Sequence, residues 1–485
     1  MPVLNEDILH HVVTYISSEE LQRINSCNPV FYEAWMKSRY RSLTFVKRDK
    51  EMKRLLQHLS DPNVAYHVKK IELRPWLVQP RDKTPQSKTE NTIVKVLKVF
   101  DPHYTKKKAD HRLQKRLEKD KHRVLTAFKQ MHRLEEYSID WDDTVGHHPE
   151  FFKAFLAPAL ENWSDQLVCL TIKVPPRMLD ALARVRLSKL ETFIYHFCTG
   201  HLSSKEIADT HDGFIVFVNN LKDSLESLTL ASTYTSQELD ISRVFRKLGH
   251  FPKLKKVTLS IPFDGGHLSN PMTFVHFLER HRSTLREINL STSRCCVRNK
   301  PGDPEYINWI QRILGSIQTP FPQLQTLAVA LRPLRAPLDV LIQFLNMHAG
   351  TISSLVLTER ALNFAELANL FDDDLFAESL EMLQLKTDEF SAFFLSRIAT
   401  MFPHLKTLKV ECNRLVYHEL RNRAGVPGLG NSEFSANLED FAHSFAAVWG
   451  LQHLAVGPFD SAQELDFKQA MKKYLPQVHV THFIS

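Results

Sequence analysis

A single short pattern of apolar and polar residues recurs along the whole chain. In the segment LESLTL, Leu225, Leu228 and Leu230 are apolar and the residues between them are polar. The end of this segment alternates with period two, which is typical of a strand with one buried face. The same outline, apolar at positions one, four and six, starts at 14 places: Tyr40, Val68, Leu134, Leu167, Leu190, Leu225, Leu254, Leu285, Leu324, Ile352, Leu380, Leu405, Leu451 and Leu475.

The spacing of these copies predicts a repeat architecture. Most successive copies lie about 23 to 39 residues apart, which leaves room for one strand and one helix. Three copies share the lead-in Phe-Pro-x-Leu, at Phe251, Phe321 and Phe402. A proline there ends a preceding helix before the strand begins. We therefore expect residues 40–485 to form an α/β repeat solenoid with a parallel sheet.

Two stretches interrupt the array. The spacing doubles between Val68 and Leu134, which predicts an insertion at about residues 78–125. Within it, residues 106–123 are dense in lysine and arginine, and Leu113 and Leu117 give them a thin apolar stripe that suits a helix lying on the solenoid. A second gap, at about residues 418–434, has the glycine, asparagine and proline content of an exposed loop. The basic run either contacts RNA or phosphate or forms a solvated helix face, and the lack of interleaved aromatics favours the solvated face.

Residues 1–39 differ from everything that follows. Apolar residues from Leu4 to Ile16 recur at helical spacing, Ser17 or Ser18 caps a second helix, and Asn28-Pro29 starts a third. Three short helices bury too little surface to be secure alone, so such a module packs on its own chain or on a partner.

This opening segment resembles an F-box. The residues that follow the F-box pattern are Leu4, Asp7, Ile8, Leu9, Val12, Tyr15, Ile16, Leu21, Ile24 and Phe31. Asn5 stands where the family usually has proline, and Cys27 where it usually has valine. With repeats following at once from Tyr40, the chain is similar to F-box/leucine-rich-repeat proteins, many of them fungal. The alternative is that these helices merely cap the first repeat, since a solenoid needs its end covered.

The resemblance implies a fold and partners. It implies a leucine-rich-repeat-like horseshoe with a concave parallel sheet and convex helices, preceded by a three-helix F-box. It also implies that the F-box docks on the Skp-type adaptor of a cullin-based (SCF) ubiquitin ligase. The alternative function is that of a ubiquitin-independent repeat scaffold that contacts RNA or phosphate through residues 106–123. The residues expected at the adaptor are Leu4, Ile8, Leu9, Val12, Leu21, Ile24 and Phe31.

Composition narrows the setting. Hydrophobic residues make up 43% and charged residues 24% of 485 residues, which describes a folded chain. The six cysteines form no CxxC pair, the chain opens without a signal peptide, and no apolar run approaches the roughly 20 residues that a bilayer needs. We expect a cytoplasmic or nuclear protein without a membrane span. The net charge of +7 is modest for this length, so nucleic acid is not the expected partner.

Catalytic motifs are missing from the sequence. It has no P-loop, GxSxG or HExxH motif. His196, Cys198 and His201 are the nearest approach to a metal set, but a fourth ligand is missing, and zinc requires four placed groups. We expect no enzyme activity, no metal and no cofactor.

The polar positions of the repeats therefore carry the functional hypothesis. Residues that alternate with the buried leucines face away from the core and form one continuous surface for a protein target. Trp76 and Trp141 follow early strands and either join this surface, since Trp beside charged residues is typical of binding hot spots, or pack under the insertion. The residues expected to bind the target are Lys70, Glu72, Arg74, Trp76, Glu136, Asp140, Trp141, Lys386, Lys409 and Glu411.

Overall fold

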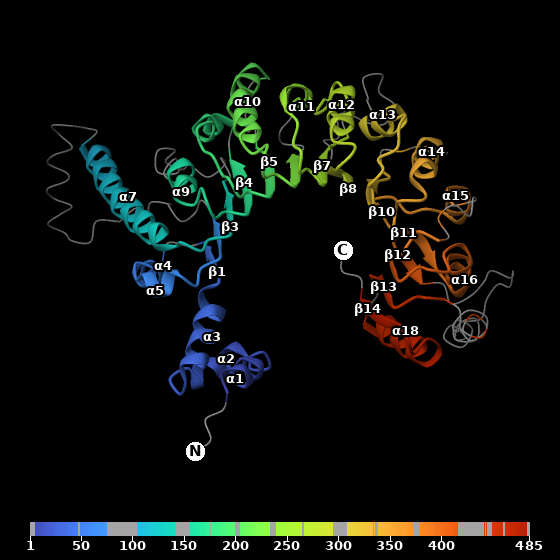
Figure 1. Ribbon diagram of the computed structural model, residues 1–485, viewed down its shortest axis with the longest axis horizontal. Coiled ribbons are helices and arrows are strands. Elements are labelled where there is room, and N and C mark those ends of the chain that lie inside the picture. Colours follow the sequence, from blue (N-terminus) through green and yellow to red (C-terminus); the bar gives the residue numbers. More distant parts are fainter. Residues whose placement is uncertain are drawn as a thin grey trace. The chain divides into compact units, whose positions relative to one another are not determined.

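A computed structural model shows the architecture of the chain (Figure 1). It describes residues 5–46, 49–74, 104–141, 155–174, 176–198, 204–232, 239–263, 266–293, 308–332, 334, 338–371, 376, 378–415, 441, 443, 449–458 and 461–482. Leu4, Trp76, His201 and the loop expected at 418–434 lie outside these residues. The chain divides into two compact units, Met1–Glu226 and Ser227–Ser485.

The predicted α/β repeat solenoid is confirmed at the level of its sheet. The described strands form one 14-stranded sheet in which spatial order follows sequence order, and every described pair is parallel. The strands of the first unit are β1 (Ser42–Phe45), β2 (Lys70–Leu73), β3 (Glu136–Asp140), β4 (Cys169–Val174) and β5 (Thr192–Phe197). Those of the second are β6 (Ser227–Ser232), β7 (Lys256–Pro262), β8 (Glu287–Ser293), β9 (Thr326–Ala330), β10 (Ser354–Thr358), β11 (Met382–Phe390), β12 (Thr407–Leu415), β13 (His453–Gly457) and β14 (His479–His482).

The apolar triads lie in the core and set the strand register. Leu228 of β6 pairs with Val257 of β7, and Leu230 pairs with Leu259, so equivalent positions of successive repeats align. All triads from that of Tyr40 to that of Leu451 are buried at all three positions. Each strand therefore has one face in the core and one open face, as the alternating burial of its residues shows.

The last repeat departs from the predicted register. Leu454 of β13 pairs with Val480, whereas the pattern starting at Leu475 places Val478 there. The strand is displaced by two residues, which keeps the same side chains on the core face. Leu475 and Val478 remain buried in the turn that follows α18 (Ser461–Tyr474). Because β14 pairs only with β13 among the described strands, its own alternation constrains the register less than in the inner strands.

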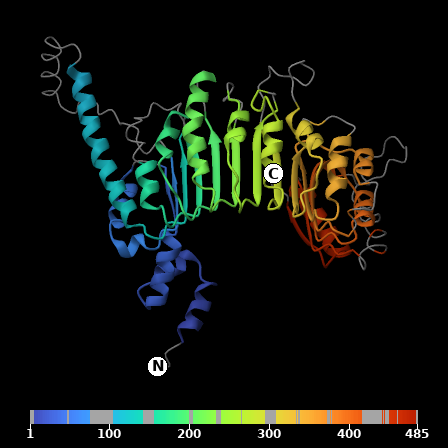
Figure 2. The same cartoon turned by 45° about the horizontal axis from the view of Figure 1, so that its top comes forward.

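Helices cover one face of the sheet within each unit (Figures 1 and 2). In the first unit, α1 (Glu6–Val13), α2 (Ser18–Ile24) and α3 (Pro29–Tyr40) precede the sheet. They are followed by α4 (Lys50–His58), α5 (Pro62–Ala65), α7 (Tyr104–Gln130), α9 (Ala157–Asn162), a 3₁₀ helix (Pro176–Leu182) and α10 (Ser204–Asn219). The second unit contributes α11 (Ser242–Lys247), α12 (Met272–Arg280), α13 (Trp309–Ser316), α14 (Asp339–His348), α15 (Phe364–Leu370), α16 (Ala392–Met401) and α18.

The part of the insertion that the structure describes is a helix of the repeat array. Helix α7 extends over 27 residues and contacts α4, α5 and α9. Leu117, Val124, Ala127 and Phe128 are buried, and the ring of Phe128 lies 5.0 Å from that of Trp163. The predicted helix lying on the solenoid is thus confirmed, with the insertion joined to the core by the C-terminal half of α7.

Candidate functional site

The three N-terminal helices form a small packed module held by local capping. Asn5 caps α1, Ser17 and Glu20 form a reciprocal capping box at the start of α2, and Asn28 caps α3 with Pro29 in its first turn. Helices α1 and α2 both contact α3. Leu9, Leu21, Val30 and Met36 are buried between them.

Helix α1 presents an apolar stripe to solvent. Ile8 is 50% exposed, Val12 is 40% exposed, and Tyr15 just beyond the helix is 77% exposed. Residues spaced by four and three lie on one face of a helix. Single exposed apolar side chains are common on protein surfaces and need no explanation. Several of them grouped on one small module indicate a contact surface.

The residues expected at the adaptor therefore divide by burial. Ile8 and Val12 are exposed, Ile24 and Phe31 are half-buried, and Leu9 and Leu21 belong to the core of the module. Leu9 and Leu21 can affect docking only by holding α1 and α2 in place. The sequence pattern does not separate these roles, because exposed and buried apolar residues alternate at helical spacing on the same short helices.

Tyr32 is an exposed aromatic residue of the same three-helix module that the expected adaptor set leaves out. It is half exposed, and its ring lies 6.0 Å from that of Trp35 on α3. The guanidinium of Arg39 lies 5.4 Å from the ring of Trp35. Grouped Tyr, Trp and Arg side chains are the residue types enriched at binding hot spots. Their spacing of three and four along α3 is visible in the sequence.

The open face of the first unit carries charges that pair across strands. Lys70 of β2 lies 2.7 Å from Glu136 of β3, and Lys173 of β4 lies 3.0 Å from Asp140 of β3. The hydrogen bond to Glu136 raises the pKa of Lys70. Arg74 lies 2.7 Å from Glu72 just past β2. The predicted charged residues are thus brought together on one face, but they largely neutralise one another.

His196 lies on the same face, at the level of Lys173 in the register of β4 and β5. Burial lowers the pKa of His196, and Lys173 lowers it further, against the opposing effect of Asp140. At neutral pH this residue therefore contributes an uncharged ring to the face. Within the described ranges, no group of three or more His, Cys, Asp and Glu side chains is placed to hold a metal ion.

Trp141 does not belong to the open face. Its side chain is 1% exposed, and its backbone N–H donates to the carbonyl of Lys173 at 2.6 Å. The expectation that Trp141 contacts a target is therefore wrong, because the side chain is buried. The reason is positional: Trp141 follows Asp140, an open-face residue, so the alternation turns it towards the core.

In the second unit the open face mixes small polar side chains with charged ones. On β6 to β8 it presents Ser227, Thr229, Thr258 and Asn289, and the amine of Lys256 on β7 lies 2.7 Å from the carboxylate of Glu287 on β8. On β11 and β12 it presents Lys386, whose amine lies 2.6 Å from Glu411. Lys409 of β12 is paired with Gln384 on β11 and with Ala455 on β13. It forms no ion pair with any residue in the described ranges.

The basic character of α7 is partly compensated. Lys121 and Arg123 face Glu118 and Asp120 at 3.8 and 3.7 Å. Lys115, Lys119 and Lys129 are exposed. This arrangement suits a solvated helix face, and contact with RNA or phosphate stays a prediction.

None of the described helices is both long and apolar enough to cross a bilayer. In comparisons with known proteins, the chain matches no protein-family model and no curated protein.

Proposed function

We propose that this chain is the substrate-recognition subunit of a cullin-based ubiquitin ligase. Residues 1–39 would dock on a Skp-type adaptor, and the open face of the sheet would bind the protein target. The chain then acts without chemistry of its own, by raising the effective concentration of a target near the catalytic subunits of the ligase.

The observation that supports docking is the exposed stripe of Ile8, Val12 and Tyr15. A module that covered its own apolar side would need no partner and would serve only as a cap. Here Ile8 and Val12, which lie beside buried Leu9 on α1, are only half covered by the described residues. Its location immediately before the first repeat matches the order expected of F-box/leucine-rich-repeat proteins.

The finer shape, a horseshoe whose concave wall is the sheet, belongs to the same proposal. Neighbouring strands lie about 4.8 Å apart, whereas packed helices need about 8–10 Å. When each repeat supplies one strand and one helix, the helix layer is therefore the longer one and the array bends towards its sheet. A target would contact residues from several repeats at once on such a wall.

The adaptor contact is tested by replacing Ile8 and Val12 together with aspartate in the full chain. We expect binding to a purified Skp-type adaptor to weaken by about 100-fold, because two carboxylates would then lie in an apolar interface. Binding is measured by titration calorimetry, and circular dichroism checks that the solenoid still melts at the parent temperature.

A matched control is the double substitution Lys53→Asp and Gln57→Asp. These two residues are exposed on α4 at the same spacing of four, outside the module. We expect the control to bind the adaptor like the parent chain. Equal adaptor binding by all three proteins, or no binding by the parent, would remove the proposal.

A further inference from the structure

Strand β1 is an open edge of the sheet. It pairs with β2 alone among the described strands. The amides of Lys70 and Arg74 donate to the carbonyls of Arg41 and Phe45. In a parallel pair, alternate residues make both bonds to the neighbour. Ser42 and Thr44 therefore direct their N–H and C=O groups away from β2, towards the edge.

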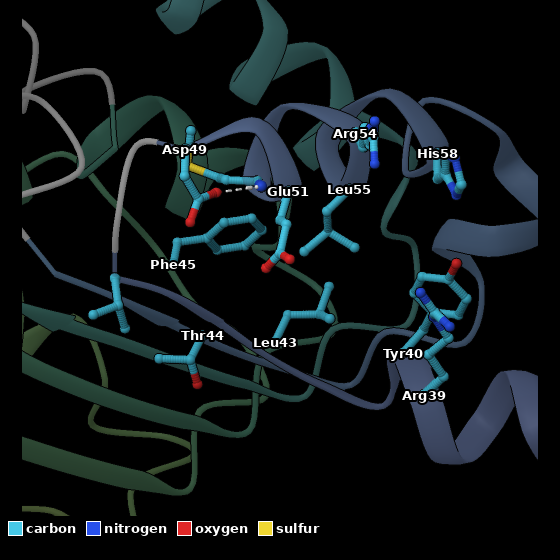
Figure 3. Close-up of a pocket in the computed structure, with 12 residues that line it drawn as sticks. Arg39, Tyr40, Leu43, Thr44, Phe45, Asp49, Glu51, Arg54, Leu55 and His58 are labelled. Carbon is cyan, nitrogen blue, oxygen red and sulfur yellow. Dashed lines mark hydrogen bonds between the residues drawn. The ribbon is translucent and has the colours of Figure 1, made fainter. Parts of the chain in front are cut away.

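A cavity lies beside this edge. It has a volume of about 760 Å³, lies between β1 and α4 and is about half open to solvent (Figure 3). Leu43 and Phe45 form its apolar floor on the strand, and Leu55 faces them from the helix. Strand-addition sites combine an open strand edge with an adjacent apolar pocket, since the main chain supplies affinity and the pocket receives alternate side chains. Among the described strands, the outward groups of Ser42 and Thr44 have no neighbouring strand, and the cavity lies beside them.

The charges around the cavity are ordered. Asp49 and Glu51 lie at the end of the cavity near Phe45, Arg39 lies at the opposite end beside Tyr40, and Arg54 lies next to Leu55 between the two ends (Figure 3). Glu51 and Arg54 are exposed, and neither forms an ion pair within the ranges that the structure describes. The edge thus has an acidic end, an apolar middle and a basic end.

We propose that β1 binds an extended peptide segment of a partner protein by strand addition. The segment would carry a basic side chain beside Glu51, an apolar side chain over Leu43 and Leu55, and an acidic side chain towards Arg39 and Arg54. This surface is separate from the open face of the sheet and from the exposed stripe of α1, so it provides a third contact.

The length and pattern of the segment follow from strand geometry. From Ser42 to Val46 the edge extends about 16 Å, which matches about five extended residues. Only alternate side chains of these residues point to the helix side of the sheet and enter the cavity. The side chains between them lie on the open-face side and need only be polar and suited to a strand.

The test uses a fluorescein-labelled peptide with the core Asp-Thr-Leu-Thr-Lys, titrated with the full chain and followed by fluorescence anisotropy. Two matched peptides carry backbone N-methyl groups, one on the leucine amide and one on the two threonine amides. The order of charges requires this peptide to run parallel to β1, and in parallel addition the leucine amide faces β1 whereas the threonine amides face away. We expect the peptide methylated on the leucine amide to bind about tenfold more weakly and the peptide methylated on the threonine amides to bind like the parent peptide.

A protein variant tests the same bonds from the other side. Thr44→Pro removes the outward N–H of β1 without touching the bonds to β2, and edge strands tolerate proline at such positions. We expect about tenfold weaker peptide binding than for the control Thr44→Val, which keeps that N–H. The charge reversals Glu51→Lys and Arg54→Glu, both at exposed positions, are each expected to weaken binding about two- to fivefold.

Several results would overturn the proposal. One is a dissociation constant above about 1 mM for the parent chain. Another is equal binding of the two methylated peptides. A third is equal binding by Thr44→Pro and Thr44→Val with both variants folded by circular dichroism. If Thr44→Pro does not fold, the methylated peptides decide alone, because they leave the protein unchanged.

Discussion

Two buried histidines make the same set of bonds in two different repeats. The Nε2 atom of His281 accepts the backbone N–H of Phe251 at 2.9 Å, and that of His348 accepts the N–H of Phe321 at 3.0 Å. In each ring, Nδ1 lies 2.7 Å from a helix carbonyl, which holds the neutral tautomer that donates from Nδ1. Both bonds stabilise the Phe-Pro turn that leads into a strand.

These bonds predict acid sensitivity. Burial lowers the pKa of His281 from 6.5 to about 4, with His250 and Arg280 adding to the effect, and burial also lowers the pKa of His348. The unfolded chain therefore binds more protons than the folded chain below about pH 6.5. Because of this difference, the free energy of unfolding should fall as the pH drops from about 6.5 to about 4, where the contribution of His281 ends. Urea unfolding at a series of pH values measures this change in the free energy of unfolding.

The control is the double substitution His281→Phe and His348→Phe. It should cost about 1–3 kcal/mol per site at neutral pH, because the N–H groups of Phe251 and Phe321 lose their acceptors. It should also flatten the dependence of the unfolding free energy on pH between about 4 and 6.5. If the dependence of the unfolding free energy on pH stays the same, groups other than these two histidines cause the loss of stability in acid.

At the level of elements, the N-terminal module depends on its caps more than on its core. Its helices have at most 12 residues, and isolated helices of this length are marginal in water. The side chain of Asn28 accepts the N–H of Val30 at 2.8 Å and starts α3, the helix on which α1 and α2 pack.

We expect Asn28→Ala to destabilise the module by about 0.5–2 kcal/mol, with Asn28→Asp close to the parent because a carboxylate also caps. Hydrogen exchange of residues 5–40, followed by mass spectrometry, measures the loss of stability in the module. Exchange of the strands, measured in the same experiment, shows whether the rest of the chain is affected. The expectation is wrong if the alanine and aspartate variants exchange alike.

At the level of the whole molecule, each described repeat meets mainly its neighbours in the sheet. The helix contacts follow the same order, as for α11 with α12 and α12 with α13. Repeat arrays of this kind transmit a local defect to adjacent repeats and only weakly beyond them.

Leu228→Asp should reveal this short range. Leu228 is fully buried in β6, so an aspartate there leaves a charge in the core. We expect amide protection to fall in β6 and β7 and to persist in β10 to β12. The neighbouring substitution Thr229→Asp, on the open face, should leave protection unchanged throughout. Uniform loss in every strand would indicate one cooperative unit instead of an array.

What the sequence alone determined is the set of features that depend on near neighbours. The strands, their order and their register through β13 follow from triads such as Leu225, Leu228 and Leu230, because burial of one face requires the same alternation in every repeat. The caps of the first three helices follow from local Ser, Asn and Pro residues in the same way.

The tertiary structure alone decided what depends on residues far apart in the chain. It separated exposed Ile8 and Val12 from buried Leu9 and Leu21, and it packed Phe128 of α7 against Trp163. It also opened the cavity between β1 and α4. Alternation tells which face of an element is buried, but the partner at that face comes from another element, and only the folded chain brings the two together.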